Sequence, residues 1–322
     1  MEDSRIACLV TGCAGFIGSH LAERLLARGC SVIGVDNLAT GHRRNMAAFA
    51  EHPDFTFFER DVCAPGLVAK ARTVCPRLSH VFHLAAVVSV PYSVDHPRHT
   101  MAVNLDASVS LHEAAREAGL RAFVFAGSAA EYGETATVPI VEGAAGPDTV
   151  QQSPYGRAKF LASARIAASG FGVSLRCFNV YGPRQSASSP YSGVISLFME
   201  RGLCGRPLTI FGDGGQTRDF VAVSDVVEGY LLAAGLTGPT ETPLAGIFNV
   251  GTGHSTSILE LARLVAKLTG NDREPEFLSS RQGDIRHSVA DFSKFAAAGF
   301  SPNLSLEKGL AILLDWQRLQ KG

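Results

Sequence analysis

The feature that most constrains the fold of this sequence is a glycine turn between a short apolar run and a helical pattern near the N-terminus. The apolar run is Ile6–Val10, and leucines at helical spacing then continue as far as Gly29. Gly12 suits a tight turn, Gly15 lets a pyrophosphate approach the start of the helix, and Gly18 permits close packing of helix against strand. The segment therefore predicts a strand, a phosphate-binding turn and a helix.

Apolar runs and helical patterns continue to alternate along the first half of the chain. The runs include Ser31–Val35, Phe55–Phe58, His80–His83 and Ala122–Phe125, and a helical pattern extends from about Asn104 to Ala118. Strands that alternate with helices predict an α/β fold, a doubly wound parallel sheet with right-handed crossovers. We expect a dinucleotide-binding Rossmann domain over 1–176, with late strands from about 215–250, and a smaller, interleaved C-terminal α/β substrate-binding lobe over 177–322.

Several polar residues follow these apolar runs, where a parallel sheet binds its ligands. Asp36 ends the second run, roughly 20 residues after the glycines, where a carboxylate accepts hydrogen bonds from both ribose hydroxyls. Because Asp36 would repel a 2′-phosphate, we predict NAD rather than NADP as cofactor. We expect Asp61, Ala85, Ser128 and Tyr155 to meet at the same rim.

The segment Ser153-Pro154-Tyr155-Gly156-Arg157-Ala158-Lys159 predicts the start of a helix that carries a reactive pair. Ser153 is a good N-cap and Pro154 suits the first helical position, so Tyr155 and Lys159 should share one face. A cation beside a tyrosine favours the phenolate, which gives a proton acceptor usable near neutral pH. The alternative is an ordinary exposed pair on an amphipathic helix. Ser128, at a strand end before this helix, is the other catalytic candidate.

The composition argues against several classes of protein. With a net charge of −1 and no long basic run, the chain is not expected to bind nucleic acid or an anionic membrane. No apolar stretch reaches the roughly 18 residues of a membrane span, and the acidic N-terminus does not resemble a signal peptide, so we expect a cytoplasmic protein. The seven cysteines are scattered without CxxC spacing, which predicts reduced thiols and no metal site.

Taken together, the motifs resemble the extended short-chain dehydrogenase/reductase family, specifically its nucleotide-sugar epimerases and dehydratases. The resemblance spans nearly the whole chain. It is carried by TGCAGFIGSH at Thr11–His20, VDN at Val35–Asn37, DV at Asp61–Val62, HLAA at His83–Ala86, GSAAEYG at Gly127–Gly133 and the SPYGRAK segment.

The resemblance implies specific roles for residues of the first half. Ser128 would bond the sugar 4-hydroxyl, Tyr155 would exchange its proton, and Lys159 would hold the nicotinamide ribose and lower the pKa of the tyrosine. Asn104 would support the geometry behind them. The implied NAD-binding residues are Gly12, Gly15, Phe16, Ile17, Gly18, Asp36, Asn37, Asp61, Val62, Leu84, Ala85, Ala86, Asn104, Tyr155 and Lys159.

For the second half, the resemblance implies a UDP-sugar site. Arg218 and Arg281 would bind the two phosphates and Asp284 the nucleoside ribose, while the small side chain of Ser288 would leave room beside the sugar 2-substituent. The implied substrate-binding residues are Ser89, Ser128, Asn179, Phe211, Arg218, Arg281, Asp284 and Ser288. Tyr181 would line the nicotinamide. The UDP-N-acetylglucosamine 4-epimerases are the most similar group, and the family pairs as homodimers through the helices that carry Asn104 and Tyr155.

The reaction implied is epimerisation at sugar C4 through a transient 4-keto sugar. Related dehydratases and decarboxylases carry an acid where this chain has Ala129 and Ala130, and in a strand-like stretch Glu131 should point to the other face, so we read it as structural. The alternatives are a UDP-glucuronate or UDP-glucose 4-epimerase, a dehydratase or decarboxylase that uses Glu131, and, from another class, a non-catalytic NAD sensor.

Overall fold

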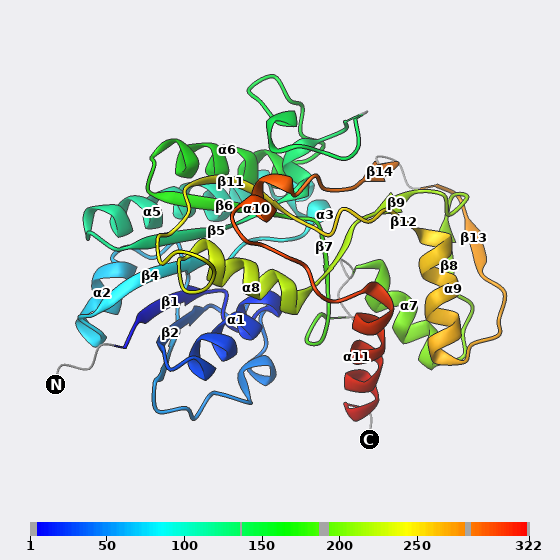
Figure 1. Ribbon diagram of the computed structural model, residues 1–322, viewed down its shortest axis with the longest axis horizontal. Coiled ribbons are helices and arrows are strands. Elements are labelled where there is room, and N and C mark those ends of the chain that lie inside the picture. The colour runs from blue at the N-terminus through cyan, green and yellow to red at the C-terminus, as the bar shows by residue number, and fades with distance from the viewer. Residues whose placement is uncertain (1–4, 136, 187–192, 281–284, 321–322) are drawn as a thin grey trace.

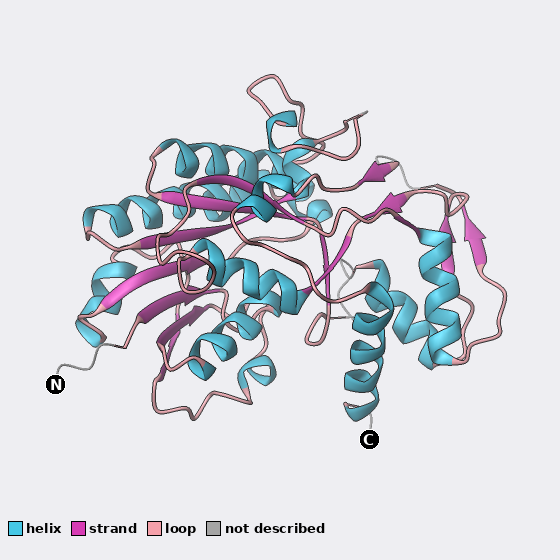
Figure 2. Cartoon of the chain, viewed as in Figure 1, coloured by secondary structure: helices cyan, strands magenta, loops and turns pink. Residues whose placement is uncertain are grey.

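A seven-stranded parallel sheet forms the centre of the protein, as the computed structural model shows (Figures 1 and 2). The structure describes residues 5–135, 137–186, 193–280 and 285–320. The strand order is β3-β2-β1-β4-β5-β6-β11, all neighbours running parallel. The strands are β1 Ala7–Thr11, β2 Ser31–Asp36, β3 Phe55–Glu59, β4 Leu78–His83, β5 Ala122–Ser128, β6 Gly172–Cys177 and β11 Gly246–Val250. The predicted doubly wound α/β fold is confirmed.

Helices cover both faces of this sheet (Figure 1). On one face lie α1 Phe16–Ala27 and α8 Val223–Ala233, and on the other lie α2 Leu67–Val74, α5 Ala107–Glu117 and α6 Pro154–Ala168. Successive residues of β1 point to opposite faces, Val10 into the first core and Leu9 into the second. Both faces of the sheet are therefore shielded from solvent, which explains why the strands appear in the sequence as continuous apolar runs.

Short helical segments join these elements near the strand ends. They are η1 Arg43–Met46, α3 Val90–Asp95, α4 Pro97–Met101, η2 Ala102–Asp106, η3 Ala129–Tyr132 and η4 Glu142–Ala144. The helix expected from about Asn104 begins instead with η2, a π-helical turn, before α5 takes over. It ends as predicted before Gly119, which has a φ of 65°.

A smaller lobe follows β6 and occupies the right of Figure 1. Its helices α7 Val194–Leu203, α9 Ile258–Thr269 and α11 Leu306–Leu319 enclose a separate apolar core. Its short sheets pair β7 Asn179–Tyr181 with β10 Phe220–Ala222, β8 Thr209–Phe211 with β13 Glu276–Leu278, and β9 Thr217–Arg218 with both β12 Thr256–Ser257 and β14 His287–Ser288; α10 Ser293–Ala297 packs beside β11. Within the described ranges, no helix is long and apolar enough to cross a membrane.

Candidate active site

The glycine turn after β1 forms a cradle that no larger residue could build. Gly12 has a φ of +74°, and a Cβ there would lie 2.8 Å from the main-chain nitrogen of Ala85. A Cβ on Gly18 would lie 2.0 Å from the carbonyl oxygen of Gly12. The start of α1 can therefore sit directly against the turn, with its free N–H groups open to an anion. This geometry fits the pyrophosphate of a dinucleotide.

Acidic side chains stand beside this cradle at the ends of β2 and β3. The Asp36 carboxylate is 8% exposed and accepts hydrogen bonds from the N–H groups of Ala14 at 3.0 Å and Leu38 at 2.8 Å. Burial raises its pKa. Next to it, the Asn37 amide donates to the Asp61 carboxylate at 2.8 Å. The structure thus brings together the acids predicted to hold the adenosine half of NAD.

A buried hydrogen-bonded chain links the glycine turn to the helix that carries Asn104. Thr11 Oγ1 lies 2.7 Å from His83 Nδ1, and His83 Nε2 lies 2.8 Å from Ser108 Oγ. Ser108 donates to the carbonyl of Asn104, whose side chain both donates to and accepts from the main chain of Val87 at 2.8 Å. Burial lowers the pKa of His83 to about 3, so the ring is neutral at physiological pH.

Asn104 therefore supports the loop after β4, as the resemblance implies. This loop contains Leu84, Ala85 and Ala86 at the carboxyl end of the sheet. Two other members of this hydrogen-bonded chain, Thr11 and His83, lie in the motifs TGCAGFIGSH and HLAA. Their connection could not be read from the sequence because it joins residues far apart in the chain.

The first turn of α6 presses against η3. Ser153 caps the helix by accepting the N–H of Gly156 at 3.1 Å, and Pro154 takes the first helical position, as predicted. A Cβ on Gly156 would lie 2.6 Å from the carbonyl oxygen of Ala130. Gly156 therefore lets α6 approach η3 closely. This contact brings Tyr155 next to Ser128 at the end of β5.

Ser128 and Tyr155 meet, but the electrostatics around the phenol differ from the prediction. Burial raises the pKa of Tyr155 to about 12, although a hydrogen bond with Ser128 opposes the shift. Lys159 is 2% exposed, donates from Nζ to the carbonyl of Ala126 at 2.8 Å, and has its pKa lowered by burial to about 8. The expectation that Lys159 lowers the tyrosine pKa is not met by the protein groups alone, because burial dominates and the group that lowers the pKa is Ser128, through its hydrogen bond.

Glu131 is structural, in agreement with the sequence interpretation. Its carboxylate is fully buried and pairs with Arg176 Nε at 2.6 Å. The reason differs from the one expected, because residues 129–132 form the 3-10 turn η3 rather than a strand-like stretch. Ala129 and Ala130 carry no acid, so the elements around Ser128 offer no group for the elimination that a dehydratase requires.

Four of the residues predicted to hold the substrate lie on the short strands of the smaller lobe. Arg218 on β9 pairs in register with Ser288 on β14, and Asn179 on β7 is joined to this unit because its N–H donates to the carbonyl of Asp219 at 2.9 Å. Phe211 ends β8. Ser89 is buried and caps α3 by accepting the N–H of Tyr92. The predicted residues Arg281 and Asp284 lie outside the described residues.

Tyr181 does not line the cofactor site as the resemblance implied. Its ring is 2% exposed within the core of the smaller lobe, and a Cβ on Gly309 of α11 would lie 2.0 Å from its hydroxyl oxygen. Asn179, two residues earlier on the same strand, is only half-buried, so burial in the lobe core sets in at the Tyr181 end of β7.

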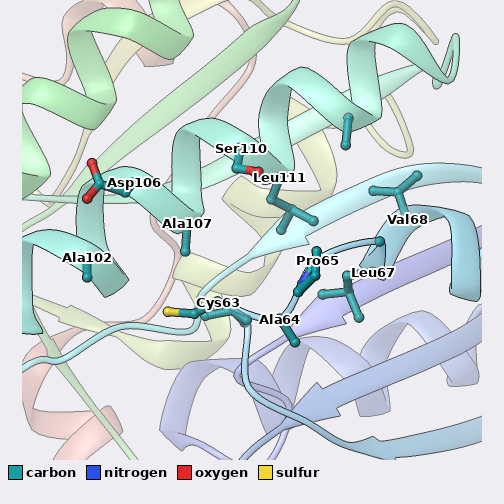
Figure 3. A pocket seen from close by; sticks show the side chains of 13 residues that line it. Cys63, Ala64, Pro65, Leu67, Val68, Ala102, Asp106, Ala107, Ser110 and Leu111 are labelled. Atoms are coloured by element: carbon teal, nitrogen blue, oxygen red, sulfur yellow. The ribbon is translucent and has the colours of Figure 1, made fainter.

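A separate cavity of about 320 Å³ lies between the turn after β3 and the side of α5 (Figure 3). Its lining is mainly apolar, with Leu67 and Leu111 facing each other across it and Asp106 and Ser110 at its edge. Val62 is the one predicted NAD-binding residue among those described that line it. The catalytic candidates do not face this cavity.

The sheet, the glycine cradle and the acidic strand ends together define a dinucleotide-dependent enzyme. Residues 8–251 match the model of the NAD dependent epimerase/dehydratase family. The chain belongs to this family, and its cofactor is NAD.

Known proteins of the family resemble this chain over nearly its full length. The UDP-glucose 4-epimerase of Mycolicibacterium smegmatis is 38% identical over 317 residues, which make up 96% of this chain and 98% of that protein. The crystal structure of a Thermotoga maritima UDP-glucose 4-epimerase with UDP-glucose has a TM-score of 0.88 at 35% identity and covers 98% of this chain and 100% of that one. A UDP-N-acetylglucosamine 4-epimerase of Methanobrevibacter ruminantium, in complex with UDP-N-acetylmuramic acid, has a TM-score of 0.89 at 32% identity, covering 99% and 100%.

Proposed function

We propose that this protein is an NAD-dependent UDP-sugar 4-epimerase whose preferred substrates are UDP-N-acetylglucosamine and UDP-N-acetylgalactosamine. The observation that carries the proposal is a hydroxyl, a phenol and an ammonium group, from Ser128, Tyr155 and Lys159, gathered at the carboxyl end of the sheet without an acid at Ala129 or Ala130. Such a set can move one proton but offers no group for eliminating water.

In the proposed mechanism, Tyr155 is the acid and base. As phenolate it takes the proton of the sugar 4-hydroxyl, with Ser128 bonded to both oxygens so that the proton has a short path. NAD, when bound, supplies a reversible hydride acceptor and a positive charge that favours the phenolate. Tyr155 then returns the proton to the 4-oxygen of either epimer, and the enzyme ends in its starting state.

The proposed NAD site uses the cradle and the strand ends described above. Gly12, Gly15 and Gly18, with Phe16 and Ile17 at the start of α1, would surround the pyrophosphate. Asp36 would hold the adenosine ribose. Asn37, Asp61 and Val62 would surround the adenine, and Leu84, Ala85, Ala86 and Lys159 would hold the nicotinamide half, with Asn104 behind them.

The proposed UDP site lies in the smaller lobe, on strands that hold the nucleotide firmly while the hexose turns over. Arg218 offers a planar fork suited to phosphate oxygens. Its neighbour Ser288 is small, which would leave room for an N-acetyl group at the sugar 2-position. This last point is what favours N-acetylated sugars over plain hexoses.

Incubation with a panel of UDP-sugars tests the proposal. The panel comprises the N-acetylglucosamine, glucose and glucuronate forms, with products resolved by chromatography and weighed by mass spectrometry. An isomer of unchanged mass, formed fastest from UDP-N-acetylglucosamine, is expected. Fastest conversion of UDP-glucose or UDP-glucuronate would correct the specificity, and loss of water or carbon dioxide would overturn epimerisation. NAD binding without any conversion would identify a sensor.

We further propose that the protein is a cytoplasmic homodimer that pairs through α5 and α6. The outer side of these helices lies on one face of the sheet, away from α1 and α8 (Figure 1). Sedimentation equilibrium is expected to give twice the chain mass of 34.1 kDa. A single-chain mass at micromolar concentration would contradict pairing without affecting the proposed chemistry.

A further inference from the structure

Directly behind Ser128 lies an ion pair that solvent does not reach. Glu131 is 0% exposed and Arg176 is 1% exposed, with 2.6 Å between Glu131 Oε2 and Arg176 Nε. Glu131 belongs to the turn η3, and Arg176 to the neighbouring strand β6. Burying two charges costs several kcal/mol per ion, and such a pair is often no more stable than apolar residues of equal size. Stability alone therefore does not account for it.

The second carboxylate oxygen of Glu131 acts on the catalytic region. Oε1 accepts the N–H of Ser128 at 2.8 Å and the hydroxyl of Ser163 at 2.9 Å. In return, Ser128 Oγ accepts the N–H of Ala130 at 3.2 Å, which closes a reciprocal capping box around η3. Glu131 thus fixes the backbone of Ser128, while Ser163 ties it to α6 one turn after Lys159.

Arg176 is held equally firmly on its own side. Its guanidinium donates from Nη1 to the carbonyl of Glu142 at 2.9 Å and lies 4.7 Å from the ring centroid of Tyr132. Burial acts to lower the pKa of Arg176, but the charge of Glu131 and the contact with Tyr132 outweigh it and raise the pKa. Arg176 therefore stays charged and keeps the Glu131 carboxylate in place.

We propose that Glu131 and Arg176 form a charge-balanced pair that positions Ser128 against Tyr155. Both are positioning residues, since neither reaches the reacting atoms. This inference rests on the proposed function for the role of Ser128, but the hydrogen bond between Ser128 and the phenol of Tyr155 does not depend on which sugar is used.

The phenol of Tyr155 is surrounded by a small set of groups that bear on its ionisation. Besides Glu131 they are Ser128 from β5, Lys159 one turn along α6, Cys177 from β6 and Tyr230 from α8. The hydrogen bond with Ser128 lowers the pKa of Tyr155 against the effect of burial. A variant in which Ser128 is no longer held in place should therefore ionise Tyr155 at higher pH.

Two double variants separate the positioning effect from general damage to the core. Glu131→Gln/Arg176→Met and Glu131→Met/Arg176→Met both lack the ion pair and both avoid a lone buried charge. Only the first keeps an oxygen that can accept the N–H of Ser128. We expect the methionine version to lose about 10- to 100-fold more kcat than the glutamine version, with similar KM values, because a small misplacement of a catalytic group is costly. Equal kcat values in the two variants would overturn the positioning role.

The position of Ser128 is also measured without turnover. The ultraviolet absorbance of tyrosinate is titrated in the NAD-bound protein and in the same protein with Tyr155→Phe, so that the difference isolates one phenol. Tyr155 should ionise at higher pH in the methionine version than in the glutamine version, because only the latter keeps the acceptor that holds Ser128, and equal titrations would overturn the positioning role. If no UDP-sugar is converted by the wild type, the proposed function fails while this titration still decides the inference. Asp225→Asn is a control, because that buried carboxylate accepts the N–H of Leu304 rather than that of Ser128, and its replacement should leave the titration unchanged.

Discussion

The ammonium group of Lys159 donates a hydrogen bond to the carbonyl of Ala126, 2.8 Å away near the end of β5. The bond fixes a buried cation one helical turn from Tyr155, with the ring of Phe125 4.6 Å from Nζ. One hydrogen bond and one aromatic face compensate only part of the lost hydration, which is why burial lowers the pKa of Lys159 to about 8.

Lys159→Met is expected to stabilise the NAD-free protein while abolishing turnover. A fall in the lysine pKa from 10.5 to about 8 corresponds to roughly 3 kcal/mol. The unfolded chain binds the extra proton between these values, so the wild type gains stability as pH rises through this window. The advantage of the variant should be largest below about pH 8 and shrink toward pH 10.5. Urea unfolding at several pH values measures the difference in unfolding free energy between the variant and the wild type. A difference that does not change with pH would contradict this explanation.

Tyr155→Phe is expected to lower kcat by about 10²- to 10⁴-fold, the usual contribution of general acid–base catalysis. The ring remains, so NAD affinity should change little. Product formation from the best UDP-sugar and NAD binding by calorimetry measure the two effects. Tyr92→Phe serves as control, since this tyrosine of α3 packs its ring beside His96, just after the helix, and has no proposed proton to transfer. Normal turnover by Tyr155→Phe would refute the assignment of the base.

Gly18→Ala is expected to weaken NAD binding by at least about 10-fold and to cost about 1–3 kcal/mol of stability through overpacking. The added methyl would lie 2.0 Å from the carbonyl of Gly12, so the turn or the helix must shift. Gly143→Ala is the matched control, because a methyl there meets nothing within 4 Å. Calorimetric titration with NAD compares the two variants, and equal affinities would show that the turn does not hold the cofactor.

His83→Gln is expected to make the protein less sensitive to acid. In the wild type the unfolded chain takes up a proton near pH 6.5, whereas the folded ring does so only near pH 3, so stability is lost as pH falls through this window. Removing the imidazole should reduce the slope of unfolding free energy against pH by about 1.4 kcal/mol per unit between pH ~4 and ~6. An unchanged slope would mean that folding does not lower the pKa of His83. Burial also lowers the pKa of His80, to about 4, and this histidine remains in the variant as an internal reference.

The features that the sequence predicts correctly are local or periodic. The N-cap Ser153, the proline at the first helical position and the order of strand, turn and helix follow from residues within one turn of each other. The roles of Gly12 and Gly18 follow from the spacing of the glycines after β1, which is typical of a turn that packs a helix closely against a strand. Each of these depends on backbone geometry alone, which short motifs determine well.

The features that the sequence could not predict depend on burial and on distant partners. Whether Lys159 or desolvation controls the pKa of Tyr155 is decided by how deeply α6 packs, which no local pattern reveals. Arg176 appears as one charge within an apolar run, and its partner Glu131 lies 45 positions away on another element. Likewise, the direction of Tyr181 follows from where α11 docks.

The contact between Gly156 and the carbonyl of Ala130 also bears on how such an enzyme could change its substrate. Because η3 and the first turn of α6 pack closely at that point, Ser128 and Tyr155 are held together by elements other than the strands that carry Arg218 and Ser288. Substitutions in the smaller lobe can therefore accumulate and select a new sugar while the proton-transfer chemistry stays intact.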